Sequence, residues 1–581
     1  MQTINELGKH TFSAMLENSV NRFGDRPAVS YVSAEPLTYN DFYEKVKEVR
    51  QLLYSVGIRA GTQVAIYATS CPHWGIAYFA IVTMGAIVVP LLPDFSARET
   101  EACLTHSETT HMLVDERLKS KIPEAYLQTI INIGDFSLIK GEKVSDEVPP
   151  AHECNEEDTA SIIYTSGTTG RSKAVELTHK NFISNAIAGQ SCQRINEYDV
   201  ALSILPMSHV YEFTIGFLMF FLNGACIFYL IGPPTPRLLI PALQKVRPTM
   251  MLSVPMVIEK IYKTQVVPAF TASPLKKKIT STRLGRKLFS RIAGKKLLKT
   301  FGGRIKFFGI GGAKTDPAVE QFMKDAKFPY AIGYGLTETS PLIAGSSPKQ
   351  TVPEWIGYVI PEVDVKLINV NPETGIGELV VKGPNVMKGY YKDPELTDES
   401  FTEDGYFKTG DLFFIDSKGH VSIKGRSKNM IVGANGENIY PEDIEFVLNQ
   451  HPFVSEALVV EGEHSSLVAL VQLDEEKLAA ELKKMEEVTV AEADKKDDEN
   501  TRLQNLQEAM GDAMADFSNA MTYKRAEILN EIKFFVNSHV NKISRIDKVE
   551  PVEKFEKTAS QKIKRYLYNF RKKSNEKTPE N

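Results

Sequence analysis

The chain has 581 residues, more than one hydrophobic core usually organises, so the sequence predicts at least two domains. A formal net charge of −5 and a pI near 6.2 exclude the overall basic field of a typical nucleic-acid-binding protein. Five scattered cysteines without a CxxC pair favour free thiols over a disulfide framework or a zinc site. Because the N-terminus also lacks a signal-peptide pattern, we expect a cytoplasmic protein.

Short β-branched runs alternate with helical stretches from about residue 25 to residue 420. This alternation predicts an α/β fold class, with doubly wound sheets in a large N-terminal part. The expected strands are Gln63–Tyr67, Ile87–Leu91, His111–Val114, Ala201–Leu205, Met250–Val254 and Ile305–Ile310.

The apolar segment Phe213–Ile231 is almost long enough to cross a bilayer. Asn223-Gly224 interrupts it, which predicts a buried helix over Tyr211–Leu222 and a buried strand over Ala225–Leu230. An earlier helix, Gly75–Thr83, leads into a strand in the same way. Two such units favour a buried parallel sheet over a membrane span.

The segment Lys276–Lys306 is strongly basic and carries apolar residues at helical spacing. Two interpretations stay open for it: peripheral contact with a membrane surface, and a solvated helix face.

Closely spaced strands and turns follow from about Val363 and predict a β-subdomain at the end of the N-terminal part. A helix over Pro441–Gln450 and strands over Val454–Glu461 and Leu467–Leu473 then indicate a small α+β domain. The predicted domains are therefore 1–426 and 427–581. A charge-rich, mostly helical insert is expected at about 474–545, most simply as a solvated excursion.

The segment Ile162–Leu177 reads IIYTSGTTGRSKAVEL, an apolar strand followed by a loop of hydroxyls and glycines. Glycines let a backbone approach phosphates, while N–H groups, hydroxyls and a lysine donate to phosphate oxygens. A Walker A motif cannot be placed here, and a polar surface turn is the plain alternative. The candidate triphosphate-binding residues are Thr165, Ser166, Gly167, Thr168, Thr169, Gly170 and Lys173.

Three further motifs follow in order: YGLTET at Tyr334–Thr339, YFKTGD at Tyr406–Asp411, and GRSK at Gly425–Lys428. Together with the first loop, this series resembles the adenylate-forming superfamily. The resemblance runs from about Thr38 to Lys564 and is interrupted by the insert. It implies an enzyme that uses ATP and Mg²⁺ to convert a carboxylate into an acyl-adenylate, and then passes the acyl group to a thiol.

The resemblance also implies roles for single residues. Glu338 would hold Mg²⁺, a role suited to a hard carboxylate oxygen, and with Thr165 and Lys562 it would form the catalytic set. Asp411 and Arg426 would bind the ribose. The remaining implied ATP-binding residues are Gly312, Ala313, Gly333, Tyr334, Gly335 and Thr337, which would line the adenine pocket or lie within its motif.

The resemblance assigns two tasks to the C-terminal domain. Lys428 would be the hinge about which this domain turns between two half-reactions, and Gly436 would line the CoA tunnel. The motif FEKTASQKIKR places Lys562 as the adenylation lysine, with a solvated basic tail as the alternative. The chain departs from the common pattern at Ser172, Ala174 and Gln561, and Gln561 leaves the behaviour of the catalytic loop open.

The segment LPMSHVYE at Leu205–Glu212 resembles the acyl-pocket segment of fatty acyl-CoA synthetases, and the basic stretch ahead of Gly311 resembles their long-chain members. These resemblances imply that His209 and Gly311 line the acyl pocket and that the acid is a medium- or long-chain fatty acid. The implied partners are fatty acid, ATP and CoA, and no nucleic acid. Two alternatives stay open: acyl-carrier protein as the thiol acceptor, with the insert as its docking surface, and a non-catalytic nucleotide-binding relative.

Overall fold

A computed structural model describes residues 7–165, 173–432, 438–462, 466–481, 524–558 and 563–568. Their chain divides into two compact units. The larger holds the described residues up to Thr409 together with Phe413–Ile423, and the smaller holds Gly410–Leu412 and the chain from Lys424 onward. The predicted functional boundary at residues 426 and 427 stays a prediction.

Nine strands of the larger unit form a sheet with the order β16-β15-β14-β13-β12-β10-β11-β1-β2. The pairings from β14 to β1 are parallel, whereas β2, β15 and β16 pair antiparallel at the two edges. The bounds are β1 Pro27–Tyr31, β2 Leu37–Thr38, β10 Val200–Ser203, β11 Cys226–Tyr229, β12 Met250–Ser253, β13 Phe307–Ile310, β14 Tyr330–Gly335, β15 Leu342–Gly345 and β16 Tyr358–Val359.

A second sheet of eight strands has the order β19-β9-β8-β4-β3-β5-β6-β7. Its central pairings are parallel, and antiparallel strands close both edges. The bounds are β3 Gln63–Tyr67, β4 Ile87–Leu91, β5 His111–Val114, β6 Thr129–Asn132, β7 Leu138–Lys140, β8 Thr159–Thr165, β9 Lys173–Thr178 and β19 Gly389–Tyr390.

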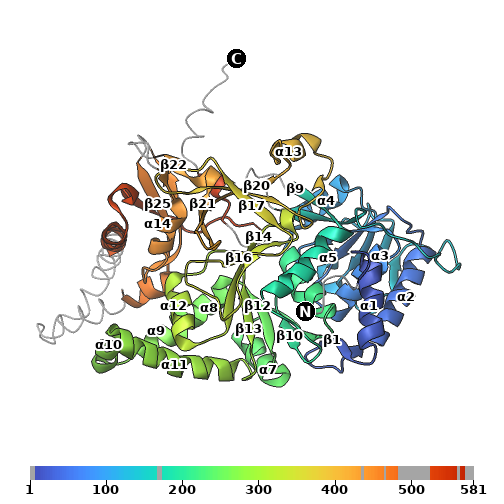
Figure 1. Ribbon diagram of the computed structural model, residues 1–581, viewed down its shortest axis with the longest axis horizontal. Coiled ribbons are helices and arrows are strands. Elements are labelled where there is room, and N and C mark those ends of the chain that lie inside the picture. The colour runs from blue at the N-terminus through green and yellow to red at the C-terminus, as the bar shows by residue number, and fades with distance from the viewer. Residues whose placement is uncertain are drawn as a thin grey trace, which may run out of the picture. The chain divides into compact units, whose positions relative to one another are not determined.

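Helices cover these sheets, and α1, α2 and α3 lie together beside the second sheet (Figure 1). Several begin with a capping box, as at Thr38, Ser96 and Thr178, where a side chain and a backbone N–H exchange hydrogen bonds. The bounds are α1 Phe12–Phe23, α2 Tyr39–Ser55, α3 Pro72–Val82, α4 Ala97–His106, α5 His179–Ala188, α6 Met219–Phe221, α7 Pro236–Val246, α8 Pro255–Ile261, α9 Val267–Thr271, α10 Pro274–Ser281, α11 Arg283–Thr300, α12 Pro317–Ala326 and α13 Pro394–Glu399.

The apolar segment around residue 213 is a buried helix followed by a buried strand, as predicted. Its first two turns are a π-helix, η3 (Tyr211–Leu218), which continues into α6. Phe213, Phe217 and Phe220 are all buried in the main hydrophobic core. Among the residues that the structure describes, none of the helices has both the length and the apolar character needed to cross a membrane.

The predicted β-subdomain is a four-stranded sheet with the order β17-β18-β20-β21. Its strands are β17 Asp364–Ile368, β18 Gly377–Lys382, β20 Phe407–Ile415 and β21 Val421–Arg426. The parallel centres of the two large sheets and this antiparallel sheet confirm the predicted α/β class of the N-terminal part.

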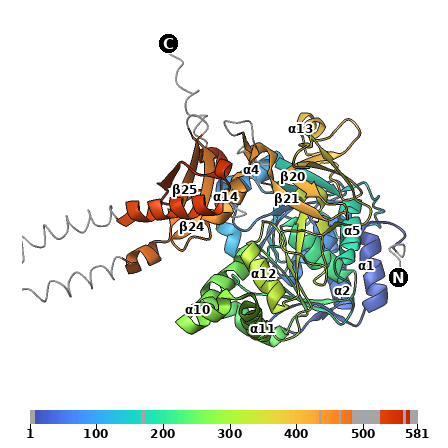
Figure 2. The same ribbon diagram turned by 60° about the vertical axis from the view of Figure 1, so that its left-hand side comes forward.

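The smaller unit is α+β, as predicted. It contains α14 (Pro441–Leu448), the short pair β22 (Ile431–Val432) and β23 (Asn438–Ile439), and the sheet β24 (Val454–Glu461), β25 (Leu467–Leu473) and β26 (Lys548–Pro551). Residues 475–481 and 524–539 of the predicted insert are helical, and 482–523 lie outside the described residues. Ile528, Ile532 and Val536 pack with residues of α14 and the sheet in one core. Figure 2 shows α14 together with β24 and β25 in this unit.

Candidate active site

The β8–β9 hairpin holds together the two ends of the predicted triphosphate loop. Thr165 ends β8, Lys173 begins β9, and these two residues are direct partners in the antiparallel register. The register therefore fixes the entry and exit of the loop side by side. The other predicted residues of this loop, Ser166, Gly167, Thr168, Thr169 and Gly170, lie outside the described residues.

Tyr390 connects Lys173 with Glu338. Strand β19 pairs antiparallel with β9, so that Tyr390 faces Val175 in the register. The Lys173 Nζ donates to the Tyr390 hydroxyl at 3.2 Å and lies 4.6 Å from the centre of its ring. The same hydroxyl donates to Glu338 Oε1 at 3.0 Å. Because Glu338 follows β14, this chain of contacts links the two large sheets.

The environment of Tyr390 keeps its hydroxyl protonated. Burial raises the pKa of Tyr390 well above its ordinary value, and the nearby Glu338 carboxylate raises it further. The hydroxyl is thus a permanent donor toward Glu338 at neutral pH.

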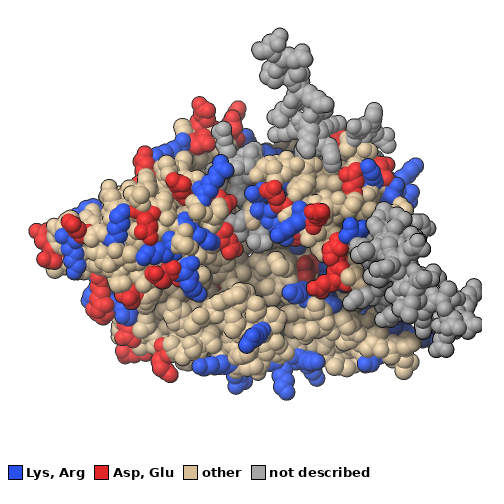
Figure 3. Space-filling model, turned by 180° about the vertical axis from the view of Figure 1, so that it is seen from behind, with Lys and Arg blue, Asp and Glu red and all other residues tan. Residues whose placement is uncertain are grey.

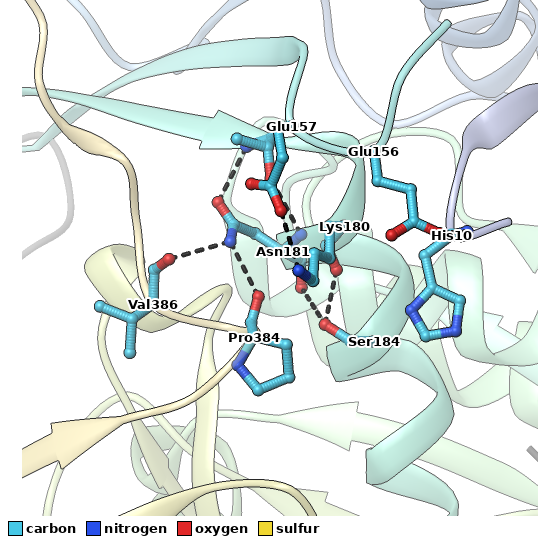
Figure 4. A network of polar contacts seen from close by, with 9 residues as sticks. His10, Glu156, Glu157, Lys180, Asn181, Ser184, Pro384 and Val386 are labelled. Atoms are coloured by element: carbon cyan, nitrogen blue, oxygen red, sulfur yellow. Dashed lines mark hydrogen bonds and ion pairs between the residues drawn. The ribbon is translucent and has the colours of Figure 1, made fainter.

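The loop that carries Glu338 is fastened from the side of α5. The Asn181 Nδ2 donates to the carbonyls of Pro384 and Val386 at 2.8 and 2.9 Å (Figure 4). The following Met387 N–H donates to the Glu338 carbonyl at 2.9 Å. Asn181 itself is held by the capping box at Thr178, so the position of Glu338 depends on a helix N-terminus.

Two buried amides hold the other end of this loop. The Nδ2 atoms of Asn185 and Asn385 both donate to the carbonyls of Thr339 and Leu342, at distances from 2.8 to 3.4 Å. The Leu342 N–H in turn donates to Asn185 Oδ1 at 3.1 Å. These bonds turn a short loop after β14 into a rigid support for a carboxylate.

The residues predicted for the adenine pocket lie at the ends of neighbouring strands. In the parallel register of β13 and β14, Ile310 faces Ile332, so Gly311 to Ala313 and Gly333 to Tyr334 leave the same edge of the sheet. Ligands bind at such carboxyl edges in open α/β sheets. Gly312 has a φ of +88°, and a Cβ on Gly335 would lie 1.7 Å from the Pro341 oxygen. Thr337 begins the 3₁₀ turn η5 (Thr337–Thr339).

The predicted acyl-pocket residues His209 and Gly311 both neighbour Tyr211, the first residue of η3. The Tyr211 N–H donates to His209 Nδ1 at 3.2 Å, and a Cβ on Gly311 would lie 3.1 Å from the Tyr211 ring. The structure therefore brings these two residues to one place. A π-helix opens the usual backbone ladder and is frequent at functional sites.

Glu212 is buried within the same π-helix. Its Oε1 accepts from the Ser203 hydroxyl at 2.6 Å, and burial raises the pKa of Glu212 to about 7. Well below pH 4.5, the carboxyl is protonated in the native and unfolded states alike. As the pH rises from 4.5 to 7, the unfolded state loses this proton first, so the native state is progressively destabilised.

Replacing Glu212 with Gln should remove this pH dependence, because the amide stays neutral and retains an oxygen for Ser203. Between pH 4.5 and 7.5 the wild type should lose about 3 kcal/mol of stability relative to the variant. Urea unfolding of both proteins at several pH values measures this difference. Glu320, whose pKa burial also raises to about 7, is present in both proteins and cancels. A constant difference across this range would contradict the prediction.

The predicted ribose-binding residues lie together in the smaller unit. The Arg426 Nε is 3.0 Å from Asp411 Oδ1, and the Asp411 side chain is buried. Lys428, the predicted hinge, is exposed in a single 3₁₀ turn, η6 (Ser427–Asn429), directly after β21. Gly436, predicted for the CoA tunnel, lies outside the described residues.

Lys562 and its neighbour Gln561 also lie outside the described residues, but both sides of their segment are anchored. Phe555 is buried, and Lys557 forms an antiparallel bridge with Ile563. The Arg565 guanidinium donates to both carboxylate oxygens of Glu445 at 2.7 Å. Arg565 is thus a structural ion-pair residue and not part of a solvated basic tail.

The surroundings of Glu338 are compatible with a magnesium site that has one protein carboxylate. Mg²⁺ is commonly held by one or two carboxylates together with substrate phosphates. Across the described ranges, no cluster of three or more His, Cys, Asp or Glu side chains could hold a metal ion by itself. A single carboxylate, oriented by Tyr390 beside Lys173, matches a site that takes its other ligands from a triphosphate.

Sequence reasoning missed Tyr390, Asn181 and Asn385. Tyr390 lies 217 residues from Lys173 in the chain, and only the pairing of β9 with β19 brings them together. The two asparagines act through side-chain bonds to distant backbone carbonyls, for which the sequence carries no local signal.

The chain is similar in sequence and in fold to known proteins. A family model described as AMP-binding enzyme matches residues 16–391. Fatty acyl-CoA synthetase A of Dictyostelium discoideum is 30% identical over 486 residues, which cover 75% of this chain and 72% of that protein. A long-chain-fatty-acid–CoA ligase of Mycobacterium bovis is 29% identical over 464 residues, covering 73% and 75%.

A solved structure gives a matching fold. The o-succinylbenzoate coenzyme A synthetase of Bacillus subtilis, in complex with ATP and magnesium ion, has a TM-score of 0.70 at 21% identity, over 95% of this chain and 98% of that chain. At this identity the likeness bears on the fold alone.

Proposed function

The chain belongs to the AMP-binding enzyme family, and we propose that it is an AMP-forming ligase that activates a medium- or long-chain fatty acid and transfers it to CoA. The products are acyl-CoA, AMP and pyrophosphate. The observation that carries the proposal is the contact chain from Lys173 through Tyr390 to Glu338 at the strand ends. It joins a cation and a carboxylate from two separate sequence motifs, as a magnesium–triphosphate complex requires.

Adenylation replaces the poor leaving group of a carboxylic acid with AMP. The fatty acid carboxylate attacks the α-phosphorus in line, and pyrophosphate leaves. Lys173 and the loop after Thr165 hold the phosphates, and Lys562 stabilises the charge that develops on the α-phosphate. Glu338 would hold Mg²⁺, which would neutralise charge on the triphosphate. Gly312, Ala313, Gly333 and Tyr334 receive the adenine.

Thioester formation follows at the same site. The CoA thiol attacks the acyl carbon of the mixed anhydride, and AMP leaves with the bond electrons. In this proposal the smaller domain turns about Lys428 between the two steps, withdrawing Lys562 and presenting Gly436 to the pantetheine arm. Asp411 and Arg426 bind the ribose.

The nature of the acid is supported by the relatives and by the residues around Tyr211. Both relatives described above are named for fatty acids. His209 and Gly311 meet at the start of a helix whose following side chains are apolar and buried, which suits an aliphatic chain.

The function is tested in two half-reactions. Fatty-acid-dependent exchange of labelled pyrophosphate into ATP reports adenylation, and a series of acids of graded length gives the preferred chain. Release of AMP with CoA, and in parallel with phosphopantetheinylated acyl-carrier protein, identifies the acceptor. We expect exchange with medium or long chains and AMP release with CoA. A protein without exchange activity would be a non-catalytic nucleotide binder.

Replacing Tyr390 with Phe should weaken the hold on Glu338 while leaving the fold intact, because only the hydroxyl is lost. Hydrogen bonds to charged groups contribute about 1.5–3 kcal/mol, so kcat/KM for adenylation should fall roughly 10- to 100-fold. The Mg²⁺ concentration for half-maximal rate should rise, while the KM for fatty acid should not. Pyrophosphate exchange measures all three quantities.

The neighbouring Tyr391 provides the control. Its hydroxyl accepts only a 3.3 Å bond from Gln63 among the bonds described here, so Tyr391→Phe should retain the wild-type Mg²⁺ dependence. An equal response of the two variants would assign the effect to local packing.

A further inference from the structure

Helices α10 and α11 carry an unusual concentration of positive charge, and α12 packs against α11. From Pro274 to Lys306 the sequence holds twelve Lys and Arg residues and no Asp or Glu, in a chain whose net charge is −5. Figures 1 and 2 both show α10 and α11 at the lower margin of the view, with α12 above them. Lys and Arg side chains project along the same lower edge in Figure 3. We call the faces of these three helices that solvent reaches the basic surface.

The basic surface contains a pocket of about 540 Å³ between α11 and α12. Its lining has six cations against one carboxylate. The Asp325 carboxylate is buried, with Arg286 Nε at 3.5 Å from Oδ2 and Gln321 Nε2 donating to Oδ1 at 3.0 Å. The remaining lining residues are Arg283, Lys287, Arg291, Lys324 and Lys327. Such an excess of positive charge in a concave site attracts an anion strongly.

An aliphatic stripe lies beside this pocket on the outer face of α11. Leu284, Leu288 and Ile292 recur every fourth residue and are 82%, 58% and 59% exposed. The opposite face, with Gly294 and Leu297, packs inward, where Gly294 approaches the Ala326 backbone. The stripe therefore takes no part in the core.

A second pair of exposed aliphatic residues extends the stripe. Leu275 and Ile279 on α10 are four residues apart and also exposed. Three or more exposed aliphatic residues in register along a helix are unusual for a surface that faces only water.

We propose that the basic surface docks onto bilayers that contain anionic phospholipids. A lipid phosphate enters the pocket, and Leu284, Leu288 and Ile292 enter the interfacial layer. Helices with an apolar stripe flanked by Lys and Arg lie in the plane of the membrane interface, with the basic side chains reaching to the headgroups. If the proposed function holds, docking places the enzyme where its fatty acid is most concentrated.

Charge complementarity favours an anionic bilayer over a second copy of the chain or an acidic protein as the partner of the basic surface. A second copy of the chain would bring the same basic surface or a weakly acidic one. An acidic protein would pair with the Lys and Arg side chains but would offer no apolar surface to Leu284, Leu288 and Ile292. A membrane interface offers anionic headgroups to the cations and an apolar layer to the aliphatic stripe along the whole of α10 and α11.

The test uses the full chain and flotation with vesicles of phosphatidylcholine alone or with 30% phosphatidylglycerol. We expect binding to the anionic vesicles only, weakened by salt. Each neutralised cation should lower the partition coefficient about fivefold. The triple variant Lys287→Gln/Arg291→Gln/Lys324→Gln should therefore bind roughly 100-fold more weakly. Leu284→Ser/Leu288→Ser should also lose binding, and its changes are at exposed positions.

A matched triple, Arg98→Gln/Lys143→Gln/Lys418→Gln, removes three exposed cations elsewhere and should bind like the wild type. Pyrophosphate exchange with a water-soluble medium-chain acid checks that all variants are folded and active. The proposal is overturned by equal binding to neutral vesicles, by unchanged binding of the pocket triple, or by equal losses in both triples. It is also overturned if the Leu variants change only the oligomeric state in sedimentation velocity.

Discussion

Replacing Lys562 with Ala should nearly abolish adenylation, lowering fatty-acid-dependent pyrophosphate exchange by about 100- to 1000-fold. Its ammonium group is proposed to stabilise charge on the α-phosphate, and removal of one such donor costs about 10²–10³ in rate. The lysine is withdrawn before thiol attack in the proposed cycle. The variant should therefore still convert synthetic acyl-adenylate and CoA into acyl-CoA at close to the wild-type rate.

Lys564 supplies the matched control for this experiment. It lies two residues further along the chain and pairs with Glu556 at 3.9 Å. Lys564→Ala should therefore retain exchange activity. Full exchange by the Lys562 variant would refute its assignment, and loss of both half-reactions would show that the change disrupts more than adenylation.

Replacing Glu338 with Gln should lower the adenylation rate at least about 100-fold, because metal-assisted charge stabilisation contributes several kcal/mol. The loop should keep its conformation, since the Gln oxygen can still accept from Tyr390 and the Met387 N–H still meets the residue 338 carbonyl. The rate should recover in part at high Mg²⁺. Exchange rates measured over a magnesium titration test both statements.

Glu395→Gln is the control, because it neutralises an exposed carboxylate at the start of α13 in the same unit. It should leave the magnesium titration unchanged. A Glu338 variant with the wild-type rate and magnesium dependence would remove this residue from the metal site.

Short, mostly apolar strands could be predicted closely. The expected Gln63–Tyr67, His111–Val114 and Val454–Glu461 agree with β3, β5 and β24 at both ends. These strands are short, apolar and bounded by turn residues, so local sequence suffices to define them. The expected end of Ile305–Ile310 was right, but its start was two residues early.

The type of helix at Tyr211 could not be predicted. Its apolar composition is compatible with α- and π-helical backbones alike. The choice between an α- and a π-helix depends on contacts that the local sequence does not show. Two examples are the hydrogen bond from Ser203 to Glu212 and the close approach of the Glu212 side chain to Gly216. Propensity carries no record of such contacts.

In the candidate site, too, some residues could be predicted from the sequence and others could not. Motifs named the groups that would touch ATP, such as Lys173 and Glu338, because their chemistry is visible in residue type. The groups that position them were hidden, because Tyr390 and Asn181 are ordinary residues until the strands pair and the loops close.

The paired amides of Asn185 and Asn385 make the Glu338 loop tolerant of mutation. Each carbonyl oxygen of Thr339 and Leu342 has two lone pairs and receives one N–H from each asparagine. When one amide is lost, both carbonyl oxygens still accept a hydrogen bond from the other. The free-energy cost of a buried acceptor without a hydrogen bond is therefore avoided. Loss of both should cost more than the sum of the single changes. Sequence drift at Asn385 is thus buffered by Asn185, whereas loss of Asn185 would also remove the acceptor of the Leu342 N–H.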